Sequence, residues 1–456
     1  MQPHIATTSR KTILITIGDG EVSKSVLQTE IFRILREKVC LVLLVHPRKL
    51  GFYREKFRSD SVIIDAMPTP SSVIIEELWS DLFLYSLHTE SIRIKIEYSY
   101  LSGGSSLGKW IKLVLWHLGR LRTYRSVCRV AYRHMTNHSY NKLLQMDRPD
   151  LVWAANMTSM DDARLLKAAR KRGIPSIGMP KGWDNLTLKT FLPVFPDKLL
   201  VQTELMKKDA ERLDYPSDSI SVVGFPKFDV YADRALLLSR DVFMEKFDFD
   251  PKRPLILYAG AGDQLAPHDE EILADLLDAI EKGIIPGSPQ VLVRPHPKYV
   301  YRAETIPNRP FWALDRPGSS VGSSSDFEFS KDDVIHLMNS LYHADILIHT
   351  ASTLGVEAAI FDRPMITLAY DGHAKLPDAL SVNRYYSYDH LRRVLATSGM
   401  SVVHSFDELL QAIVQALKDP SGQREGRARI VRENAYMIDG KAGVRVAEAL
   451  IEEVNI

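Results

Sequence analysis

The chain contains 456 residues, of which 45% are hydrophobic and 25% are charged, and its formal net charge is +1. This length predicts two or three domains with ordinary hydrophobic cores, and the near-zero charge argues against a dedicated nucleic-acid-binding protein. The two cysteines, Cys40 and Cys128, exclude a disulfide framework and a cysteine-based zinc site, and they fit a cytoplasmic protein. We expect neither a signal peptide nor a membrane span, because no apolar run approaches the ~18–20 residues that cross a bilayer.

In the first half of the chain, short apolar segments alternate with segments of helical pattern. Apolar runs bounded by turn residues are typical of strands that are buried on both faces of a parallel sheet. We expect such strands at 12–17, 39–45, 61–66, 149–155, 174–179, 197–201 and 220–224. We expect helices at 25–37, 71–87 and 160–172. This alternation predicts an α/β fold with a doubly wound parallel sheet.

One window in this half is strongly basic. Between Glu97 and Asp147 there is no acidic residue, but there are eight lysines and arginines together with Trp110 and Trp116. A basic helix that carries tryptophans and leucines can lie on an anionic membrane surface. A long surface helix whose apolar side packs on its own domain is the alternative. Residues 98–146 are therefore a candidate contact for the inner face of the cytoplasmic membrane.

A charged helical segment at 230–253 precedes a second α/β series. The strands that we expect there are 254–258, 290–293, 346–348, 365–368 and 401–405, and the helices are 268–281, 353–361, 406–417 and a terminal helix that follows Asp439 to Gly443. The Gly/Ser-rich segment 317–326 is typical of a mobile loop. The two halves share an architecture without an internal sequence repeat.

The stretch from Ala344 to Asp371 has the pattern strand, tight turn, helix, turn, strand. The first turn of a helix favours an anion, and ligands of open α/β sheets sit at the carboxyl ends of the strands. The pattern therefore predicts a phosphate at Thr350, Ser352 and Thr353, with Glu357 accepting ribose hydroxyls. A capped helix with Glu357 in a structural salt bridge is the alternative.

A second set of polar residues follows the strand at 290–293. Arginine can fork onto two phosphate oxygens, lysine supplies a point charge and histidine can donate a hydrogen bond or carry a proton. Arg294, His296 and Lys298 are such a set, and Gly260 and Gly262 in the preceding strand–helix turn would let a ligand approach closely. These groups can stabilise a nucleotide leaving group without a metal. No Asp-x-Asp triplet follows a strand.

Two loops of the first half carry candidate acceptor groups. The first strand ends in Gly18, Asp19, Gly20 and Glu21, a weak Gly-x-Gly signal that falls short of a dinucleotide fingerprint. The loop after 174–179 is rich in polar groups around one tryptophan. Its candidate residues are Lys181, Trp183, Asp184 and Asn185.

The motifs RPHPK, ADILIHTASTLGVEAAIFDRPMI and DGKAG together resemble glycosyltransferases of the GT-B architecture. The chain looks most like bacterial surface-polysaccharide and teichoic-acid-type enzymes related to CDP-glycerol glycerophosphotransferases, and it is also similar to bacterial transferases that use CMP-sugars. The resemblance is specific over 224–371 and the last helix. It implies two Rossmann-like domains facing a cleft: 1–235 for the acceptor and 236–435 for the nucleotide donor. Residues 436–456 would be a helix that returns to the first domain.

The resemblance also implies roles for residues. Arg294, His296 and Lys298 would contact the donor phosphates, Ser352 and Thr353 a phosphate, and Glu357 the ribose. The substrate would be a CMP-, CDP- or UDP-linked donor, with no cofactor and no metal.

The chain departs from this family in the loop after 174–179. The glycerophosphotransferases have a histidine there, in a Trp-His-Gly-Thr run, whereas this chain has Lys181-Gly182-Trp183-Asp184-Asn185. A base in this loop would be Asp184, which suits a sugar hydroxyl that loses its proton late in the transition state. Asp19 and Glu21 are alternative candidates for the base. Because the loop departs from the family, the sequence does not decide which group the enzyme would transfer.

These observations favour a metal-independent glycosyltransferase that moves a sugar to a cell-envelope polysaccharide or lipid-linked acceptor, as in capsule or lipopolysaccharide biosynthesis. Three alternatives stay open. They are a CDP-alditol phosphotransferase of the teichoic-acid type, a sugar-nucleotide 2-epimerase, and a non-catalytic subunit of an envelope-assembly complex.

Overall fold

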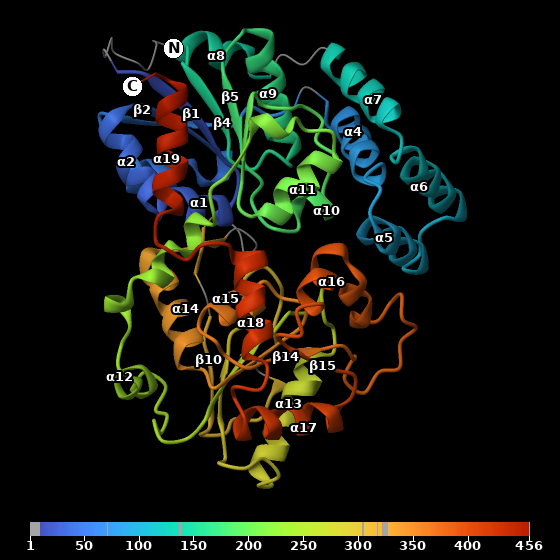
Figure 1. The fold of residues 1–456 in the computed structure, drawn as a ribbon, viewed down its shortest axis with the longest axis vertical. Coiled ribbons are helices and arrows are strands. Elements are labelled where there is room, and N and C mark those ends of the chain that lie inside the picture. Colours follow the sequence, from blue (N-terminus) through green and yellow to red (C-terminus); the bar gives the residue numbers. More distant parts are fainter. Residues whose placement is uncertain are drawn as a thin grey trace. The chain divides into compact units, whose positions relative to one another are not determined.

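The computed structural model describes residues 10–70, 72–135, 139–302, 305–316, 318–321 and 327–455. The chain divides into two compact units, each built around its own sheet (Figure 1). Unit 1 comprises 1–229, 321–328 and 439–456, and unit 2 comprises 230–320 and 329–438. The predicted α/β fold with two Rossmann-like parallel-sheet domains is confirmed. Most of the Gly/Ser-rich segment 317–326, at 317 and 322–326, lies outside the described residues.

The sheet of unit 1 has seven strands in the order β3-β2-β1-β4-β5-β6-β7, and all its pairings are parallel. The strand order reverses between β1 and β4, which is where ligands bind in open α/β sheets. The strands are β1 (Thr12–Ile17), β2 (Cys40–Val45), β3 (Val62–Ala66), β4 (Leu151–Ala154), β5 (Ser176–Gly178), β6 (Lys198–Val201) and β7 (Ile220–Val222).

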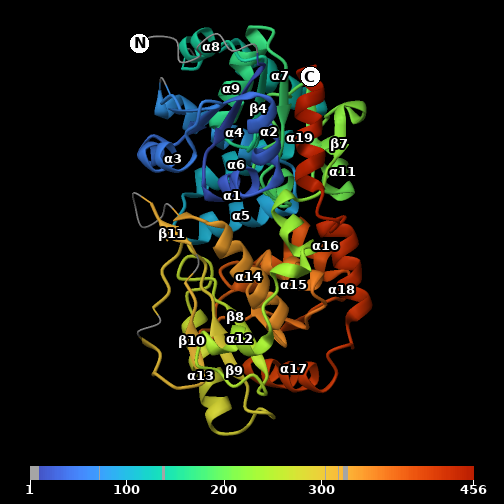
Figure 2. The ribbon, with the colours of Figure 1, turned by 90° about the vertical axis from the view of Figure 1, so that its left-hand side faces the viewer.

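Helices cover both faces of this sheet because successive strand residues point to opposite faces. Ile13 and Ile15 pack into one core with α1 (Gly20–Leu27), α2 (Glu30–Lys38) and α19 (Ala442–Glu453), and Figure 2 shows α19 beside α2. Leu14 packs into the opposite core with α8 and α9. The other helices of this unit are α3 (Leu50–Phe57), α8 (Asn141–Asp147), α9 (Met160–Lys171), α10 (Asn185–Leu188) and α11 (Glu204–Arg212).

The helix predicted at 25–37 is wrong in its bounds: it is two helices, α1 and α2. The carboxylate of Asp19 accepts hydrogen bonds from the backbone N–H groups of Glu21 and Val22, so α1 begins as early as Gly20. Thr29 is extended, with φ of −125°, and it separates α1 from α2.

The terminal helix α19 belongs to unit 1. The carboxylate of Asp229 accepts the backbone N–H groups of Ala442 and Gly443 at 2.9 and 2.7 Å, at the helix start. Arg445 donates to the carbonyl of Val223 at 2.8 Å.

The basic window forms several helices rather than one. They are α5 (Glu90–Leu101), α6 (Ser106–Leu118), α7 (Arg122–His134) and the start of α8, and α4 (Val73–Tyr85) precedes them. Gly103, with φ of 104°, lies between α5 and α6, and Gly119 ends α6. Within the described ranges, no helix is long and apolar enough to cross a membrane.

The sheet of unit 2 has six parallel strands in the order β10-β9-β8-β13-β14-β15. Its strand order reverses between β8 and β13. The strands are β8 (Leu255–Ala259), β9 (Gln290–Val293), β10 (Trp312–Leu314), β13 (Ile346–His349), β14 (Met365–Leu368) and β15 (Ser401–Val403). Two short strands lie outside the two large sheets: β11 (Ser319–Ser320) in unit 2 and β12 (Phe327–Glu328) in unit 1.

Unit 2 contains helices that the sequence analysis did not identify, chiefly α14 (Lys331–His343), α16 (Asp389–Leu395) and α18 (Arg424–Ile430). A capping box between Ser330 and Asp333 begins α14. The segment 230–253, for which we expected a charged helix before the second α/β series, contains short 3₁₀ helices and α12 (Arg240–Glu245). The remaining helices are α13 (Asp269–Glu281), α15 (Leu354–Ile360) and α17 (Phe406–Lys418).

Candidate functional site

The turn after β8 contains the two glycines predicted to approach a ligand. Gly262 has φ of 78°, a conformation that favours glycine. A Cβ on Gly260 would lie 2.5 Å from the ring of Tyr301, and one on Gly262 would lie 2.6 Å from the Cβ of Tyr299. Tyr299 and Tyr301 therefore lie against these two glycines, in the space that we had predicted for a ligand.

A buried carboxylate holds this turn in place. Asp269, in the first turn of α13, accepts hydrogen bonds from the backbone N–H of Ala261 and from the hydroxyl of Tyr258, both at 2.8 Å. Burial raises the pKa of Asp269 to about 7, although the hydrogen bonds from Tyr258 and Ala261 act in the opposite direction. The position of the turn thus depends on a group that titrates near neutral pH.

Arg294, at the end of β9, is buried and forms an ion pair with Asp315. Asp315 also lies 3.1 Å from Nε2 of His336. Burial alone would raise the pKa of Asp315, but the hydrogen bond from His336 and the charge of Arg294 bring it below its usual range. An ionised carboxylate therefore compensates Arg294, which is predicted to bind donor phosphate.

His296 and Lys298 follow in the same loop. The backbone N–H of His296 donates to the carbonyl of Gly260 at 2.7 Å, which ties this loop to the β8 turn. Its Nδ1 accepts the backbone N–H of Lys298 at 3.2 Å, and its ring stacks on Tyr299. Lys298 is exposed, and its side chain makes no ion pair or hydrogen bond among the described residues.

The turn after β13 carries Thr350, Ser352 and Thr353. Nδ1 of the buried His349 accepts the backbone N–H of Ser352 at 3.2 Å, so the proton of the neutral ring resides on Nε2. Burial lowers the pKa of His349 to about 4, which keeps this ring neutral at pH 7. The hydroxyl of Tyr386 accepts the backbone N–H of Ala351 at 3.3 Å.

The helix after this turn, α15, is shorter than the predicted 353–361. The side chain of Thr353 makes no capping hydrogen bond, whereas the hydroxyl of Ser352 accepts the N–H of Leu354 at 3.2 Å. Glu357 is buried and accepts a hydrogen bond from the hydroxyl of Tyr231. Its ribose role stays a prediction.

The sheet order brings these loops to one edge of unit 2. The strands β9, β8 and β13 are neighbours, all are parallel, and each of the loops follows the carboxyl end of its strand. The loops also flank the point where the strand order reverses, between β8 and β13. This is the place in a doubly wound sheet where a nucleotide binds.

In unit 1, the loops after β1 and β5 meet through an ion pair. Nζ of Lys181 lies 2.6 Å from the carboxylate of Asp19, and Nζ of Lys227 lies 3.5 Å from that of Glu21. Asp19 also caps α1. Two of the three predicted bases are therefore paired with lysines.

Asp184 is the third predicted base. Its carboxylate accepts a hydrogen bond from the side-chain amide of Asn185 at 3.1 Å, and no lysine, arginine or histidine among the described residues pairs with it. The side-chain oxygen of the buried Asn185 accepts the N–H of Gly182 at 2.9 Å, which fixes the loop. Asp184 and Trp183 are both half-buried.

The two glycines after β1 differ in their surroundings. Gly18 has only an ordinary contact, with Met67, but a Cβ on Gly20 would lie 2.2 Å from the carbonyl oxygen of Phe327. The backbone of β12 therefore occupies the space that we had assigned to a substrate at Gly20. The buried Lys49 holds β12 through an ion pair of 2.9 Å with Glu328.

Within the described ranges, no group of three or more histidine, cysteine, aspartate or glutamate side chains is placed to hold a metal ion.

No family model matches the chain, and no curated protein matches it. Solved structures do. A putative UDP-N-acetylglucosamine 2-epimerase from Listeria monocytogenes has a TM-score of 0.54 at 11% identity, covering 97% of this chain and 96% of that one. The UDP-GlcNAc 2-epimerase from Methanocaldococcus jannaschii, in complex with UDP-GlcNAc and UDP, has a TM-score of 0.51 at 13% identity, covering 97% and 99%.

The calicheamicin glycosyltransferase CalG4 has a TM-score of 0.51 at 12% identity, covering 98% of this chain and 99% of that one. The chain has the GT-B fold. At these identities the likeness concerns the fold alone. The GT-B fold accounts for the two parallel-sheet domains and for the loops that each sheet presents at the carboxyl ends of its strands.

The sequence analysis missed several residues that hold these loops. Asp315, His336 and Tyr386 are far in sequence from the motifs that they support, Asp269 is eight residues from Ala261, and no local pattern marks any of them. His349 was inside the stretch that we singled out, but it follows an apolar run and was not assigned a role.

Proposed function

We propose that this protein is a metal-independent glycosyltransferase that moves a sugar from a nucleotide-sugar to a hydroxyl of a cell-envelope polysaccharide or lipid-linked acceptor. The observation that carries the proposal is the loop cluster of unit 2. At the switch point of a parallel sheet, the loop after β9 presents His296 and Lys298 and the turn after β13 presents Thr350 to Thr353, while the turn after β8 is hydrogen-bonded to the loop after β9. The GT-B fold supports this proposal, since proteins of this fold bind UDP and UDP-GlcNAc.

In the proposed reaction, unit 2 binds the nucleotide of the donor. Lys298 supplies the positive charge that accompanies the departing phosphate, His296 donates a hydrogen bond, and the hydroxyls of Ser352 and Thr353 bind phosphate oxygens. Arg294 contributes through its ion pair with Asp315, which sets the path of the loop. Glu357 binds the ribose.

Unit 1 supplies the acceptor side of the proposal. Asp184 takes the proton of the acceptor hydroxyl as general base. Asp19 and Glu21 are weaker candidates, because Lys181 and Lys227 stabilise their ionised forms and so lower their basicity. Lys181, Trp183 and Asn185 would then line the acceptor site.

The donor class and cellular location belong to the same proposal. The resemblance to CDP-glycerol-type and CMP-sugar enzymes supports a CMP- or CDP-linked donor as well as a UDP-linked one. The basic window 98–146 would hold the protein on the inner face of the cytoplasmic membrane. Lipid-linked acceptors of envelope polysaccharides are found at such a surface.

A sugar-nucleotide 2-epimerase is the second candidate. The observation in its favour is that two of the three structural relatives described above are UDP-GlcNAc 2-epimerases. An epimerase needs no acceptor, so the two candidates make different products from the same nucleotide-sugar.

One experiment separates them. The protein is incubated with isotopically labelled UDP-GlcNAc or CMP- and CDP-linked donors, with and without a lipid and polysaccharide extract of cell envelopes. We expect label to enter the extract only with the intact protein and not with Asp184→Asn. Conversion of UDP-GlcNAc to its 2-epimer without extract would establish the epimerase and overturn the transferase.

A further inference from the structure

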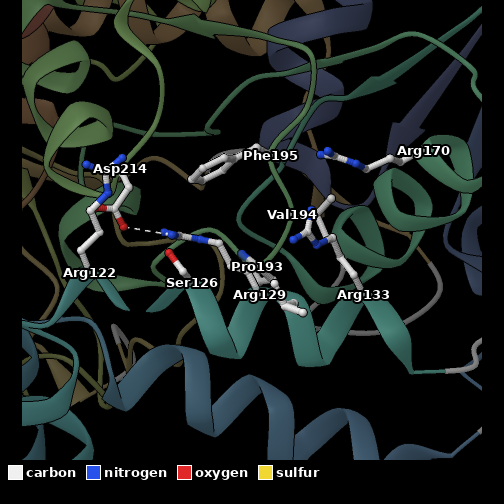
Figure 3. A pocket seen from close by; sticks show the side chains of 10 residues that line it. Arg122, Ser126, Arg129, Arg133, Arg170, Pro193, Val194, Phe195 and Asp214 are labelled. Atoms are coloured by element: carbon white, nitrogen blue, oxygen red, sulfur yellow. Dashed lines mark hydrogen bonds and ion pairs between the residues drawn. The ribbon is translucent and has the colours of Figure 1, made fainter. Parts of the chain in front are cut away.

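A pocket of about 200 Å³ lies between α7 and the segment before β6 in unit 1 (Figure 3). Arg122, Ser126, Arg129 and Arg133 of α7 line one side of it, at positions that share one face of the helix. Val194 and Phe195 of the segment before β6, together with Arg170 of α9, line the other side. In Figure 3 the guanidinium groups of Arg133 and Arg170 both point into the space beside Val194.

One arginine of the pocket is structural. Arg129 is buried and donates to the backbone carbonyls of Phe191, Leu192 and Leu213 at 3.0, 3.0 and 2.6 Å, and to the carboxylate of Asp214 at 2.9 Å. Arg125 donates to both oxygens of the same carboxylate, at 2.9 and 2.7 Å. The carboxylate of Asp214 thus accepts hydrogen bonds from two arginines.

The other three arginines of the pocket have one long ion pair among them. Arg122 lies 3.7 Å from Asp214 and its side chain is 79% exposed. The side chains of Arg133 and Arg170 make no hydrogen bond or ion pair within the described part of the chain. Three arginines therefore share the carboxylate of Asp214, whereas Arg133 and Arg170 line the same pocket without an acidic partner in the described part of the chain. Like charges this close repel one another, and a bound anion would relieve that repulsion. Guanidinium forks match phosphate oxygens in geometry and charge.

This pocket is separate from the candidate site. Phe195 precedes β6, Asp214 precedes β7 and Arg170 lies in the last turn of the helix before β5. The pocket is therefore at the amino ends of the strands of unit 1. The predicted acceptor groups Asp19 and Asp184 follow the carboxyl ends of β1 and β5, at the opposite edge of the sheet.

Helix α6, which precedes α7, has an exposed apolar stripe with helical spacing. The stripe consists of Leu107, Trp110, Ile111, Val114 and Leu118, and the side chains of Leu107 and Trp110 are 71% and 67% exposed. Exposed Leu121 connects it to Arg122 of the pocket.

The basic residues of α6 are turned the other way. Nζ of Lys109 pairs with Glu97 of α5 at 2.7 Å, and that of Lys112 lies 3.3 Å from the hydroxyl of Ser99. Part of the apolar side of α6 therefore faces water, whereas Trp116 packs on its own unit and donates to the carbonyl of Thr89 at 2.8 Å. An apolar face toward water, followed directly in the chain by the helix that lines a cationic pocket, is complementary to an anionic lipid bilayer.

We propose that the arginine pocket binds the phosphate of an anionic membrane lipid while the apolar stripe of α6 enters the headgroup layer. The proposal deepens the membrane contact included in the proposed function, and it does not depend on glycosyl transfer. The phosphate accepts hydrogen bonds from Arg133, Arg170 and Ser126, and Arg122 adds charge at the rim.

The test is co-sedimentation of the full-length protein with vesicles of phosphatidylcholine alone or with one-third phosphatidylglycerol. We expect binding only to the anionic vesicles, and at least tenfold weaker binding for the double variant Arg133→Ala/Arg170→Ala. The matched control Arg36→Ala/Arg58→Ala removes two exposed arginines of unit 1 elsewhere and should bind as the intact protein does. Equal binding by the pocket variant and the control would overturn the proposal, as would no binding by the intact protein.

Two further measurements sharpen the outcome. Val114→Ser on the apolar stripe should weaken vesicle binding severalfold while leaving calorimetric binding of inorganic phosphate unchanged. If inorganic phosphate binds the pocket as tightly as the anionic vesicles do, the site serves a free anion and the lipid assignment is wrong. Nucleotide binding by unit 2, measured on the same variants, should be unchanged. A failure of the lipid-binding proposal is therefore distinguishable from a failure of the proposed donor site.

Discussion

The loops at the carboxyl ends of the strands carry different candidate groups in the two units. Unit 1 presents the carboxylates Asp19, Glu21 and Asp184, whereas the loop after β9 in unit 2 presents Arg294, His296 and Lys298. In each unit, some of these charges are compensated by partners on neighbouring loops, as Asp19 is by Lys181 and Arg294 is by Asp315. The difference suggests a division of chemistry, with proton abstraction in unit 1 and phosphate binding in unit 2.

The pairing also separates positioning groups from reacting groups. A carboxylate that is paired with a lysine is a weaker base, because the lysine stabilises its ionised form. An arginine that is paired with a carboxylate attracts a second anion less strongly, because the pair has little net charge. Asp184 and Lys298 have no ion-pair partner in the described part of the chain. For this reason we propose Asp184 as the base and Lys298 as the group that binds the donor phosphate.

Asp184→Asn removes the proposed base without changing the size of the side chain. We expect sugar transfer to fall by about 10²–10⁴-fold, the usual range for a general base. Nucleotide affinity, measured by calorimetry, should stay within twofold. Asp19→Asn serves as the matched comparison and should lower transfer less, and a larger loss in Asp19→Asn than in Asp184→Asn would reverse the assignment.

Arg294→Ala should destabilise unit 2, because it leaves the largely buried Asp315 with only His336 as a partner. Removing one member of a buried ion pair costs on the order of 3 kcal/mol. Urea unfolding of Arg294→Ala and of Arg294→Ala/Asp315→Ala measures this cost, and the second variant should regain part of the stability. If Arg294→Ala instead weakens nucleotide binding without loss of stability, Arg294 is a phosphate ligand and not a positioning residue.

Asp269 should make stability depend on pH. Its pKa is raised to about 7 in the folded protein, so between pH 4 and pH 7 the folded state binds more protons than the unfolded state. The stabilisation is therefore present below about pH 4 and is lost as the pH rises through about 7. Urea unfolding at pH 5 and pH 8 should show a smaller pH dependence for Asp269→Asn than for the intact protein. Equal pH dependence would mean that Asp269 stays ionised.

Lys298→Ala should weaken nucleotide binding by about tenfold, which corresponds to ~1.4 kcal/mol for one charged hydrogen bond. Stability should not change, because Lys298 is exposed. Lys282→Ala is the control, since Lys282 follows α13 at the amino end of β9, away from the loop cluster. Equal affinities of the two variants would exclude Lys298 from the donor site.

Much of the fold could be predicted from the sequence, because buried parallel strands leave continuous apolar runs. The strands at 12–17, 290–293 and 365–368 have the predicted bounds. The early start of α1 was not predictable from the apolar pattern, since it depends on capping by Asp19, and the break between α1 and α2 depends on the extended backbone of Thr29. Helix α14 was missed because it follows a segment of low complexity, although its capping box at Ser330 and Asp333 is a local signal that could have marked its start.

The candidate site was predicted only in part. The motifs after β9 and β13 are local, so the loop positions follow from the sequence. The partners that fix these loops are distant: Asp315 is 21 residues from Arg294, and Glu357 is 126 residues from Tyr231. Tertiary contacts of this kind decide which charge is compensated, and neither composition nor spacing records them. The outward orientation of the apolar face of α6 also depends on packing against α5.

The most direct test of the donor site is calorimetry of the intact protein with CMP, CDP, UDP, GDP and ADP, with and without EDTA. The account predicts that one nucleotide binds clearly more tightly than the others, that EDTA leaves its affinity unchanged, and that Lys298→Ala weakens it. Absence of binding by every nucleotide, or binding that EDTA abolishes, would contradict the proposed metal-independent glycosyltransferase.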